Sequence, residues 1–235
     1  RHVDRVPRED YQMGDHLCCV LMDVNVERPG PILHVSRSSP ELVRRLFERE
    51  VAEIAEKVVE IKEVAREPGY RTKIAVDSRD PKVDPVGACV GARGARVRNI
   101  VKELGGEKID IVPFSEDPAD FVMKGLSPAK VKEVLIDEET GTATVIVPDY
   151  QLSLAIGKEG QNARLAARMT GWRVDIKSET QVAQEAAYVD VEWAEGEWIV
   201  DGETGEQVWK PAEGGPAVSA GEWTVAATDS GEEEE

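Results

Sequence analysis

Two segments of this chain repeat one pattern, and an internal repeat constrains the fold of a chain more than any other feature of its sequence. Residues 88–112 read ACVGARGARVRNIVKELGGEKIDIV, and residues 154–177 read LAIGKEGQNARLAARMTGWRVDIK. Each segment contains an apolar pair, a Gly-x-x-Gly, a helical stretch, a glycine that ends the helix, and a short β-rich run. The two copies align on Gly91 and Gly157. The chain is therefore expected to contain two structurally similar units.

The residues that precede each segment repeat as well. Residues 58–78 and 131–148 are each two β-rich runs around a turn, Pro68-Gly69 in the first and Glu139-Thr140-Gly141 in the second. Ser39-Pro40 and Asp117-Pro118 each combine a helix-capping residue with the proline that favours a first helical position. The predicted order in residues 39–115 and again in 116–177 is helix, two strands, short helix, Gly-x-x-Gly, helix and strand.

That order and that loop resemble the KH domain in its bacterial, type II topology, an α+β fold with a three-stranded mixed sheet backed by helices. A single Gly-x-x-Gly is a weak signal, because glycine pairs at this spacing occur by chance. Two copies in matched contexts are a strong one. The alternative is that these four glycines only turn the chain between helices.

The resemblance makes the two loops, Gly91-Ala92-Arg93-Gly94 and Gly157-Lys158-Glu159-Gly160, the predicted RNA-binding sites. Without a Cβ, the glycine backbone can approach a phosphodiester closely. The first amides of the following helix are unpaired, and the helix dipole favours an anion there. KH domains clamp about four nucleotides in this way. Each loop also places one cation, Arg93 or Lys158, among the amides.

The helix after each loop extends the basic edge. Arg98 and Lys102 are four residues apart and share a helix face, and they align with Arg164 and Arg168 of the second unit. The alternative is an ordinary solvated face. Gln161 and Asn162 are candidates for hydrogen bonds to base edges, although such residues at a helix start are as often caps.

A second helix face is expected to pack on each sheet. In the first unit it consists of Val97, Ile100, Val101 and Leu104, and in the second of Ala163, Ala166, Ala167 and Thr170. The smaller side chains of the second set predict a helix that lies closer to its sheet.

Residues 13–37 have the pattern of two strands around a Pro-Gly-Pro turn. Residues 1–38 resemble the second half of an OB fold of the ribosomal S-one type, and half of such a fold does not close a five-stranded barrel. A partial OB segment followed by two KH units is similar to the NusA family of bacterial transcription elongation and antitermination factors. The resemblance implies a non-enzymatic, RNA-binding protein that holds single-stranded nascent RNA near RNA polymerase and other elongation factors. It also implies effects on pausing, termination and antitermination.

Two other interpretations remain open. One is the RNA-binding appendage of a ribonuclease such as polynucleotide phosphorylase, although there a single KH unit precedes the OB domain. The other is a protein-interaction scaffold whose KH folds no longer bind RNA.

Charge is segregated along the chain. The total of 29 basic against 46 acidic residues gives −17, but residues 178–235 hold 16 of the acidic residues and only Lys210 as a base. Residues 1–177 therefore carry 28 basic and 30 acidic residues, a net of −2.

The acidic tail, residues 178–235, is expected to be largely disordered. Within it, residues 197–210 are a candidate hairpin that pairs tryptophans. The tail either competes with RNA for the basic surface or only solvates the protein.

Other classes of function receive little support. No Ser/His/Asp, paired-carboxylate or phosphate-loop signature stands in a supporting context, so no catalytic residue, cofactor or metal is expected. His16 lies near Cys18 and Cys19, but adjacent residues of a strand point to opposite faces, which argues against a metal site. No apolar run approaches the roughly 18 residues that span a bilayer. We expect a cytoplasmic monomer without a membrane segment, and the first residue, Arg1, suggests a piece of a longer protein.

Overall fold

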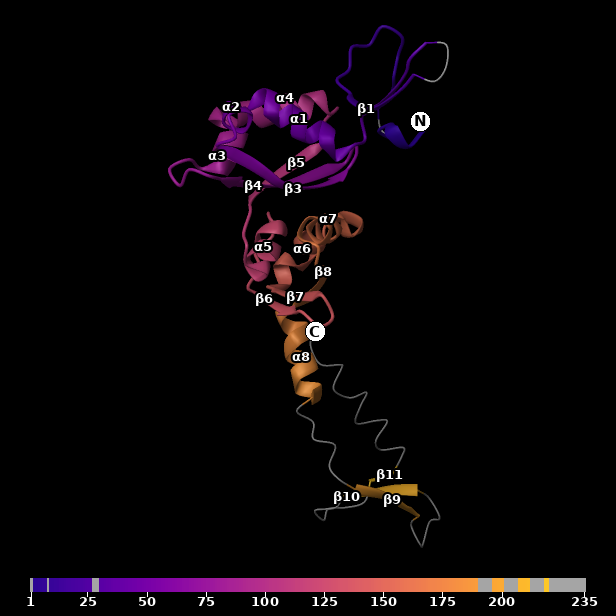
Figure 1. The fold of residues 1–235 in the computed structure, drawn as a ribbon. Helices are drawn as coiled ribbons and strands as arrows, with labels where there is room; N and C mark the ends of the chain where they lie inside the picture. The colour runs from indigo at the N-terminus through magenta and orange to yellow at the C-terminus, as the bar shows by residue number, and fades with distance from the viewer. Residues whose placement is uncertain are drawn as a thin grey trace. The chain divides into compact units, whose positions relative to one another are not determined.

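The computed structural model describes residues 2–7, 9–26, 30–189, 196–200, 207–211 and 218–219, with side chains as far as residue 184. It divides into two compact units, Arg1–Val182 and Ala183–Glu235. The first unit contains both sequence repeats (Figure 1).

The first repeat has the predicted order of elements. It consists of α1 (Pro40–Glu50), α2 (Ala52–Ala55), β3 (Val59–Glu67), β4 (Arg71–Ser78), α3 (Pro85–Val90), α4 (Ala95–Glu103) and β5 (Lys108–Pro113). The strand order is β3-β4-β5. β3 and β4 are antiparallel, with Val64 opposite Ile74, and β4 and β5 are parallel, with Ile74 opposite Ile111.

The second repeat builds the same unit from α5 (Pro118–Gly125), β6 (Glu133–Asp137), β7 (Thr142–Val147), α6 (Leu152–Ile156), α7 (Gln161–Thr170) and β8 (Arg173–Ser178). Its strand order is β6-β7-β8, again antiparallel and then parallel. The predicted α+β fold with two mixed three-stranded sheets is confirmed.

The predicted helix starts are also confirmed. The Ser39 side chain accepts a hydrogen bond from the amide of Glu41, and the Asp117 side chain accepts one from the amide of Asp120. A proline follows each cap, where its missing N–H costs nothing. These local signals fix where the first helix of each repeat begins.

Each repeat has its own apolar core. Half of the face predicted for α4 is in the first core, through Ile100 and the C-cap residue Leu104, whereas Val97 and Val101 are only half-buried. The expectation for α7 is incomplete. Ala166 packs in the core of the second repeat, but Leu165 and Met169, which the predicted face omits, are buried too. A Cβ on Gly125 of α5 would lie 3.1 Å from the Met169 side chain, so these two helices pack closely.

Leu165 and Met169 are buried because α7 lies between two sheets. They form a cluster with Phe121 of α5 and with side chains of the first repeat, Ala65, Ala75 and Val112. One face of the first sheet is thus covered by its own helices and the other by helices of the second repeat (Figure 1). A buried Lys73 adds a polar link, because its amine donates to the Ser127 carbonyl of the second repeat at 2.7 Å.

The amino-terminal segment contains the predicted hairpin, β1 (Val20–Asn25) paired antiparallel with β2 (Ile32–Ser36). Arg37, which follows it, is 4% exposed and ties the segment to the first repeat. Its guanidinium donates to both carboxylate oxygens of Glu9 at 2.5 Å and to the Glu103 carbonyl at 2.9 Å. The assignment of this hairpin to half of an OB fold stays a prediction.

α8 (Glu179–Val189) follows the second repeat. In the second compact unit, β9 (Gly196–Val200) pairs with β10 (Gln207–Pro211), with Trp198 opposite Trp209, so the candidate hairpin is confirmed. β11 (Val218–Ser219) extends this sheet. The rest of the acidic tail lies outside the described residues, and so does the expectation of disorder there.

Candidate nucleic-acid interface

The two Gly-x-x-Gly loops have the same backbone conformation. The first glycine has φ 71° in Gly91 and 76° in Gly157, and the third residue has φ 53° in Arg93 and 54° in Glu159. Each last glycine caps the following helix in the left-handed conformation without a side-chain hydrogen bond to that helix. The first amide of each helix is not unpaired as expected, because the loop forms one tight turn before the helix: the Ala95 N–H donates to the Ala92 carbonyl, and the Gln161 N–H donates to the Lys158 carbonyl.

The first glycine of each loop is required by its neighbours. A Cβ on Gly91 would lie 2.7 Å from the Arg96 side chain, and one on Gly157 would lie 2.9 Å from the backbone nitrogen of Asn162. Because neither glycine carries a Cβ, the chain turns back on the helix that leaves the loop.

Arg96 and Asn162 occupy equivalent positions and hold the short helix that enters each loop. Arg96 donates to the Ala88 carbonyl at 2.6 Å. The Asn162 side chain, 2% exposed, donates to the Leu126 carbonyl at 2.9 Å and to the Ala155 carbonyl at 3.0 Å. Its Oδ1 is buried and has no hydrogen-bond partner among the described residues. The structure gives Asn162 a packing role, and this position does not support its prediction as a base-reading side chain.

Arg98 and Arg164 also share a role that the sequence did not indicate. Arg98 donates to the carbonyl of Arg93 at 2.5 Å, and Arg164 donates to the carbonyl of Glu159 at 3.2 Å. In each repeat this arginine thus lies against the third residue of the loop. The basic face of the helix therefore contacts the loop directly in both copies.

The basic residues of the two helices have different surroundings. Arg98 and Lys102 are exposed, and within the described part of the chain neither has a carboxylate partner. Arg164, by contrast, donates to Glu67 of β3 at 2.5 Å, and Gln161 donates to the same carboxylate at 2.9 Å. Arg168 lies 3.8 Å from it. Sequence reasoning missed Glu67, because nothing local to β3 indicates a partner 97 residues away.

Hydrogen bonds from Arg164 and Gln161 keep the pKa of the Glu67 carboxyl below its usual range, against the opposing effect of partial burial. The same contact raises the pKa of Arg164. Glu67 is therefore ionised at neutral pH and stabilises the positive charge at this end of α7.

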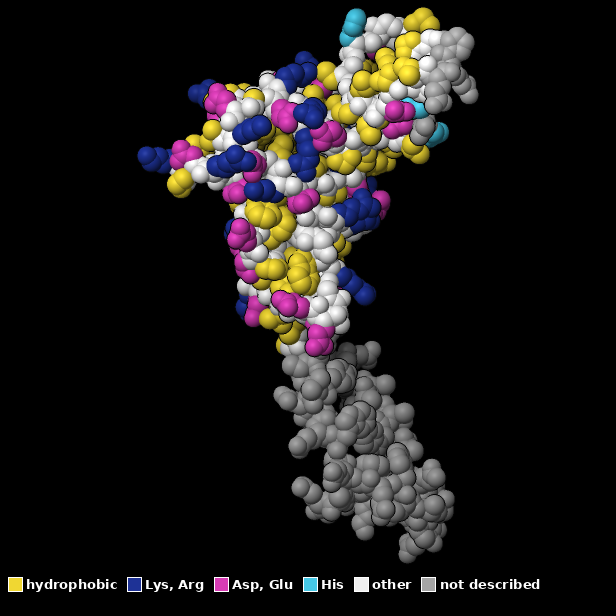
Figure 2. Space-filling model, viewed as in Figure 1, with side chains coloured by type: hydrophobic (Ala, Val, Ile, Leu, Met, Phe, Trp, Pro, Cys, Tyr) yellow, Lys and Arg dark blue, Asp and Glu magenta, His cyan; other side chains and the backbone are white. Residues whose placement is uncertain are grey.

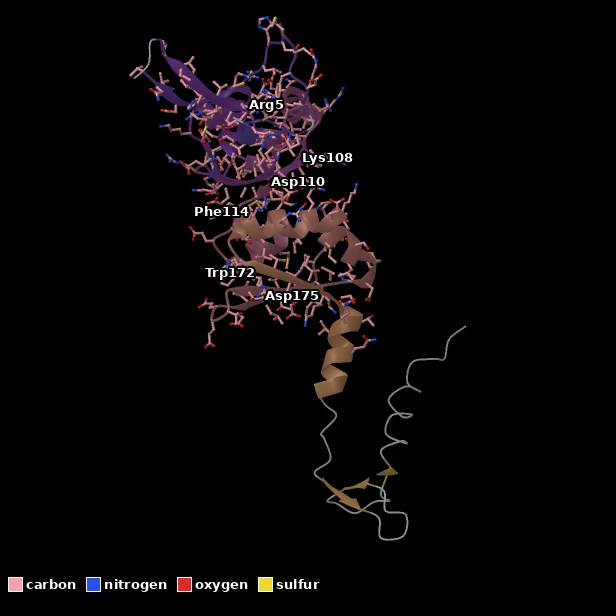
Figure 3. The ribbon with its side chains drawn as sticks, turned by 90° about the vertical axis from the view of Figure 1, so that its right-hand side faces the viewer. Arg5, Lys108, Asp110, Phe114, Trp172 and Asp175 are labelled. Atoms are coloured by element: carbon pink, nitrogen blue, oxygen red, sulfur yellow. The ribbon has the colours of Figure 1, made fainter. Side chains whose placement is uncertain are left out.

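A cleft of about 560 Å³ lies beside this ion pair. One wall is the second loop with the start of α7, and the other is the end of the first sheet. The residues of the first repeat that line it are Glu67, Tyr70, Arg71 and Lys108. Lys108 and Asp110 lie on the side of the first repeat that is next to the second (Figure 3). The second loop thus has a second wall that the sequence repeat alone does not supply.

The remaining surface is mixed in charge. Figure 2 shows Lys and Arg side chains interspersed with Asp and Glu over the first repeat. Among the described residues, no cluster of three or more His, Cys, Asp or Glu side chains is arranged to hold a metal ion. None of the described helices has both the length and the apolar character needed to cross a bilayer.

Comparison with known proteins agrees with the geometry of the loops. Residues 37–114 match the family model of the NusA-like first KH domain, and residues 118–184 match that of the NusA-like second KH domain. The chain belongs to the NusA family.

Curated relatives extend this result. The chain is 53% identical over 205 residues to the transcription termination/antitermination protein NusA of Halalkalibacterium halodurans. The aligned region covers 87% of this chain and 53% of that protein. It is 55% identical over 185 residues to the protein of the same name in Bacillus subtilis, covering 79% and 50%. For that of Mycobacterium tuberculosis, the identity is 54% over 177 residues, covering 75% and 51%. The chain thus spans about half the length of these relatives.

The second KH match extends beyond the boundary expected at residue 177, and the contacts of α8 give a reason. Glu179 pairs with Lys132, and the Thr180 hydroxyl donates to Asp149 at 3.0 Å. The first turn of α8 is therefore attached to the second KH unit. The boundary expected from the change in charge stays a prediction.

Proposed function

We propose that this chain binds single-stranded RNA through both Gly-x-x-Gly loops, as the RNA-binding part of a NusA-family factor of transcription termination and antitermination. The observation that carries this proposal is the repetition of the loop geometry. Two loops with different inner residues, Ala-Arg and Lys-Glu, have the same backbone angles and the same arginine contact. This agreement is expected when a backbone surface, rather than a particular side chain, contacts the ligand.

Phosphate is the group that fits such a surface. The backbone of each loop lies at the start of α4 or α7, where the helix dipole favours the negative charge of a phosphate oxygen. Arg98 and Lys102 lie on α4, the helix that leaves the first loop. In the second loop Lys158 is exposed, and Gln161, Arg164 and Arg168 are held by Glu67. Asn162 acts indirectly, because it fixes the short helix that enters the loop.

The family supplies the context for this binding. The curated relatives are named transcription termination/antitermination proteins, and by this resemblance the RNA is a nascent transcript in the cytoplasm, close to RNA polymerase and other elongation factors. The chain acts as a monomer with no catalytic step and no cofactor. Family membership favours this role over the RNA-binding appendage of a ribonuclease.

A scaffold whose KH folds no longer bind RNA is the alternative that an experiment must separate. The test places carboxylates among the loop amides, through Ala92→Asp, Arg93→Asp, Lys158→Asp and Glu159→Asp in one protein. Aspartate tolerates the left-handed backbone of the third loop position better than most residues. The control carries Lys57→Asp and Lys130→Asp, two exposed lysines outside the loops, and lowers the net charge nearly as much.

Binding of a random-sequence single-stranded RNA is measured for both proteins, together with thermal unfolding. We expect the loop variant to lose binding and the control to retain most of it, with similar unfolding temperatures. Unchanged RNA affinity in a folded loop variant would favour the scaffold interpretation.

A further inference from the structure

The contact between Glu67 and the second KH unit has no counterpart in the first. Arg164 and Arg98 are equivalent in the two repeats, and each donates to the third residue of its own loop. Only Arg164 also has a carboxylate partner among the described residues. Comparison of the two equivalent arginines therefore isolates the effect of Glu67, which is a carboxylate partner for the basic residue beside the second loop.

Glu67 behaves as an anion bound at the start of α7. Its two oxygens accept hydrogen bonds from Nε of Arg164 at 2.5 Å and from the side-chain amide of Gln161 at 2.9 Å. The guanidinium of Arg168 lies 3.8 Å away. A carboxylate and a phosphate present the same paired oxygens to a guanidinium, so the two groups compete for the same donors. An RNA phosphate that binds the Nε/Nη2 edge of Arg164 therefore replaces Glu67.

The ion pair is exposed enough for this exchange. The side chain of Arg164 is 45% exposed and that of Arg168 is 55% exposed, and a solvated pair of this kind is weak. Glu67 itself is 17% exposed, at the border of the cleft of about 560 Å³. Replacing Glu67 thus breaks a pair whose arginines are well solvated and whose carboxylate is only partly buried.

Cationic side chains on both walls of the cleft can also contact a phosphate. Lys158 stands in the second loop, and Lys108 is exposed on the opposite wall, at the start of β5 in the first repeat. Each contributes a positive charge near the place that Glu67 now occupies. Once Glu67 is displaced, one carboxylate of the lining, Glu159, remains against the cations of Lys108, Lys158 and Arg164, so the site attracts an anion.

We propose that this cleft binds a phosphodiester of the RNA held by the second loop, and that the phosphate displaces Glu67 from Arg164. Glu67 lowers the affinity of the second loop, and Lys108 contributes a contact from the first repeat. This inference rests on the RNA binding proposed above.

The test measures binding of a random-sequence single-stranded RNA at low salt. Glu67→Gln keeps the size of the side chain and removes its charge. Glu63→Gln is the matched control, because Glu63 lies on the same strand, is exposed, and makes no hydrogen bond or ion pair with α7 among the described residues. Both variants are also made in a protein that carries Arg164→Gln.

We expect Glu67→Gln to bind RNA about two- to five-fold more tightly than Glu63→Gln, the range for one exposed ion pair that no longer has to be broken. In the Arg164→Gln protein the two variants should bind equally. We also expect Lys108→Gln to weaken binding more than Lys57→Gln does. Thermal unfolding of each variant establishes that it is folded.

Three outcomes would overturn this inference while the proposed function stands, namely equal affinities of the two glutamate variants, weaker binding by Glu67→Gln, or the same gain without Arg164. The first two would mean that Glu67 only joins the two KH units, and the third that only net charge matters. Failure of the unaltered chain to bind RNA would instead refute the proposed function together with this inference.

Discussion

The backbone nitrogen of Asn162 lies 2.9 Å from the position that a Cβ on Gly157 would occupy. The equivalent contact in the first loop is with a side chain, because a Cβ on Gly91 would meet Cγ of Arg96 at 2.7 Å. One repeated glycine is thus confined by backbone in one copy and by side-chain atoms in the other.

This difference predicts unequal costs for the same substitution. Both glycines have a backbone conformation that is nearly restricted to glycine, so alanine at either is expected to cost about 1–3 kcal/mol in stability. Gly157→Ala should cost more than Gly91→Ala, because the backbone of α7 cannot move aside as a side chain does. Urea unfolding of the two variants measures the difference. Equal losses of stability would show that the backbone conformation of the glycine alone determines the cost of the substitution.

A buried ion pair in the first repeat makes a second prediction. Glu107 accepts from Nε and Nη2 of Arg66, both at 2.9 Å, and also from the Gly69 amide and the Thr72 hydroxyl. Removing one member of such a pair leaves an uncompensated buried charge, so Glu107→Ala should destabilise the protein by about 3–5 kcal/mol. The double variant Arg66→Met/Glu107→Ala should cost less than the two single changes added together. Additive costs in chemical unfolding would contradict a direct interaction.

The first loop predicts a defined salt dependence. If Arg98 contacts a phosphate, Arg98→Gln should weaken binding to all RNA sequences alike and reduce the salt slope of log affinity by about 0.7. Arg45→Gln is the control, since Arg45 is exposed on α1 and already paired with Glu41 and Glu48. Fluorescence anisotropy over a series of salt concentrations measures both slopes. A slope that does not change for Arg98→Gln would exclude this phosphate contact.

The lowered pKa of Glu67 predicts how its contribution to stability depends on pH. Hydrogen bonds from Arg164 depress this pKa in the folded protein, so the contribution is present above the pKa of the unfolded chain. It is lost as the pH falls through the folded value. Glu67→Gln should therefore be slightly less stable than the unaltered chain at pH 7, and the difference should disappear in acid. Thermal unfolding as a function of pH is the measurement, and a difference that persists below both pKa values would contradict it.

The acidic tail predicts an effect of truncation. Residues 185–235 carry 15 acidic residues against Lys210 alone. A chain that ends at residue 184 keeps the described contacts of Glu179 and Thr180 with the second KH unit. If the tail competes with RNA, this chain should bind RNA more tightly than the full chain at low salt, with the difference falling as salt screens the charges. Equal affinities at all salt concentrations would leave the tail a solvating segment.

Much of the fold could be predicted from the sequence, because its signals are local. Ser39 and Asp117 cap the helices that they were expected to cap, and Gly91 and Gly157 turn the chain where the repeat placed them. The hairpin within the tail was also visible as a pattern of strands around a turn. Such signals need only a few neighbouring residues, and they determine the order of elements and the two loops.

Tertiary structure alone decided how the second repeat differs from the first. The 3.6-residue period of α7 indicated one packed face, yet Leu165 and Met169 are buried on the first sheet as well. Glu67 and Arg164 meet although 97 residues separate them. A side-chain contact between two repeats leaves no periodic or local pattern in either. The sequence by itself therefore determined two loops able to approach a phosphate, and only the packing of one repeat on the other gave the second loop its carboxylate and its cleft.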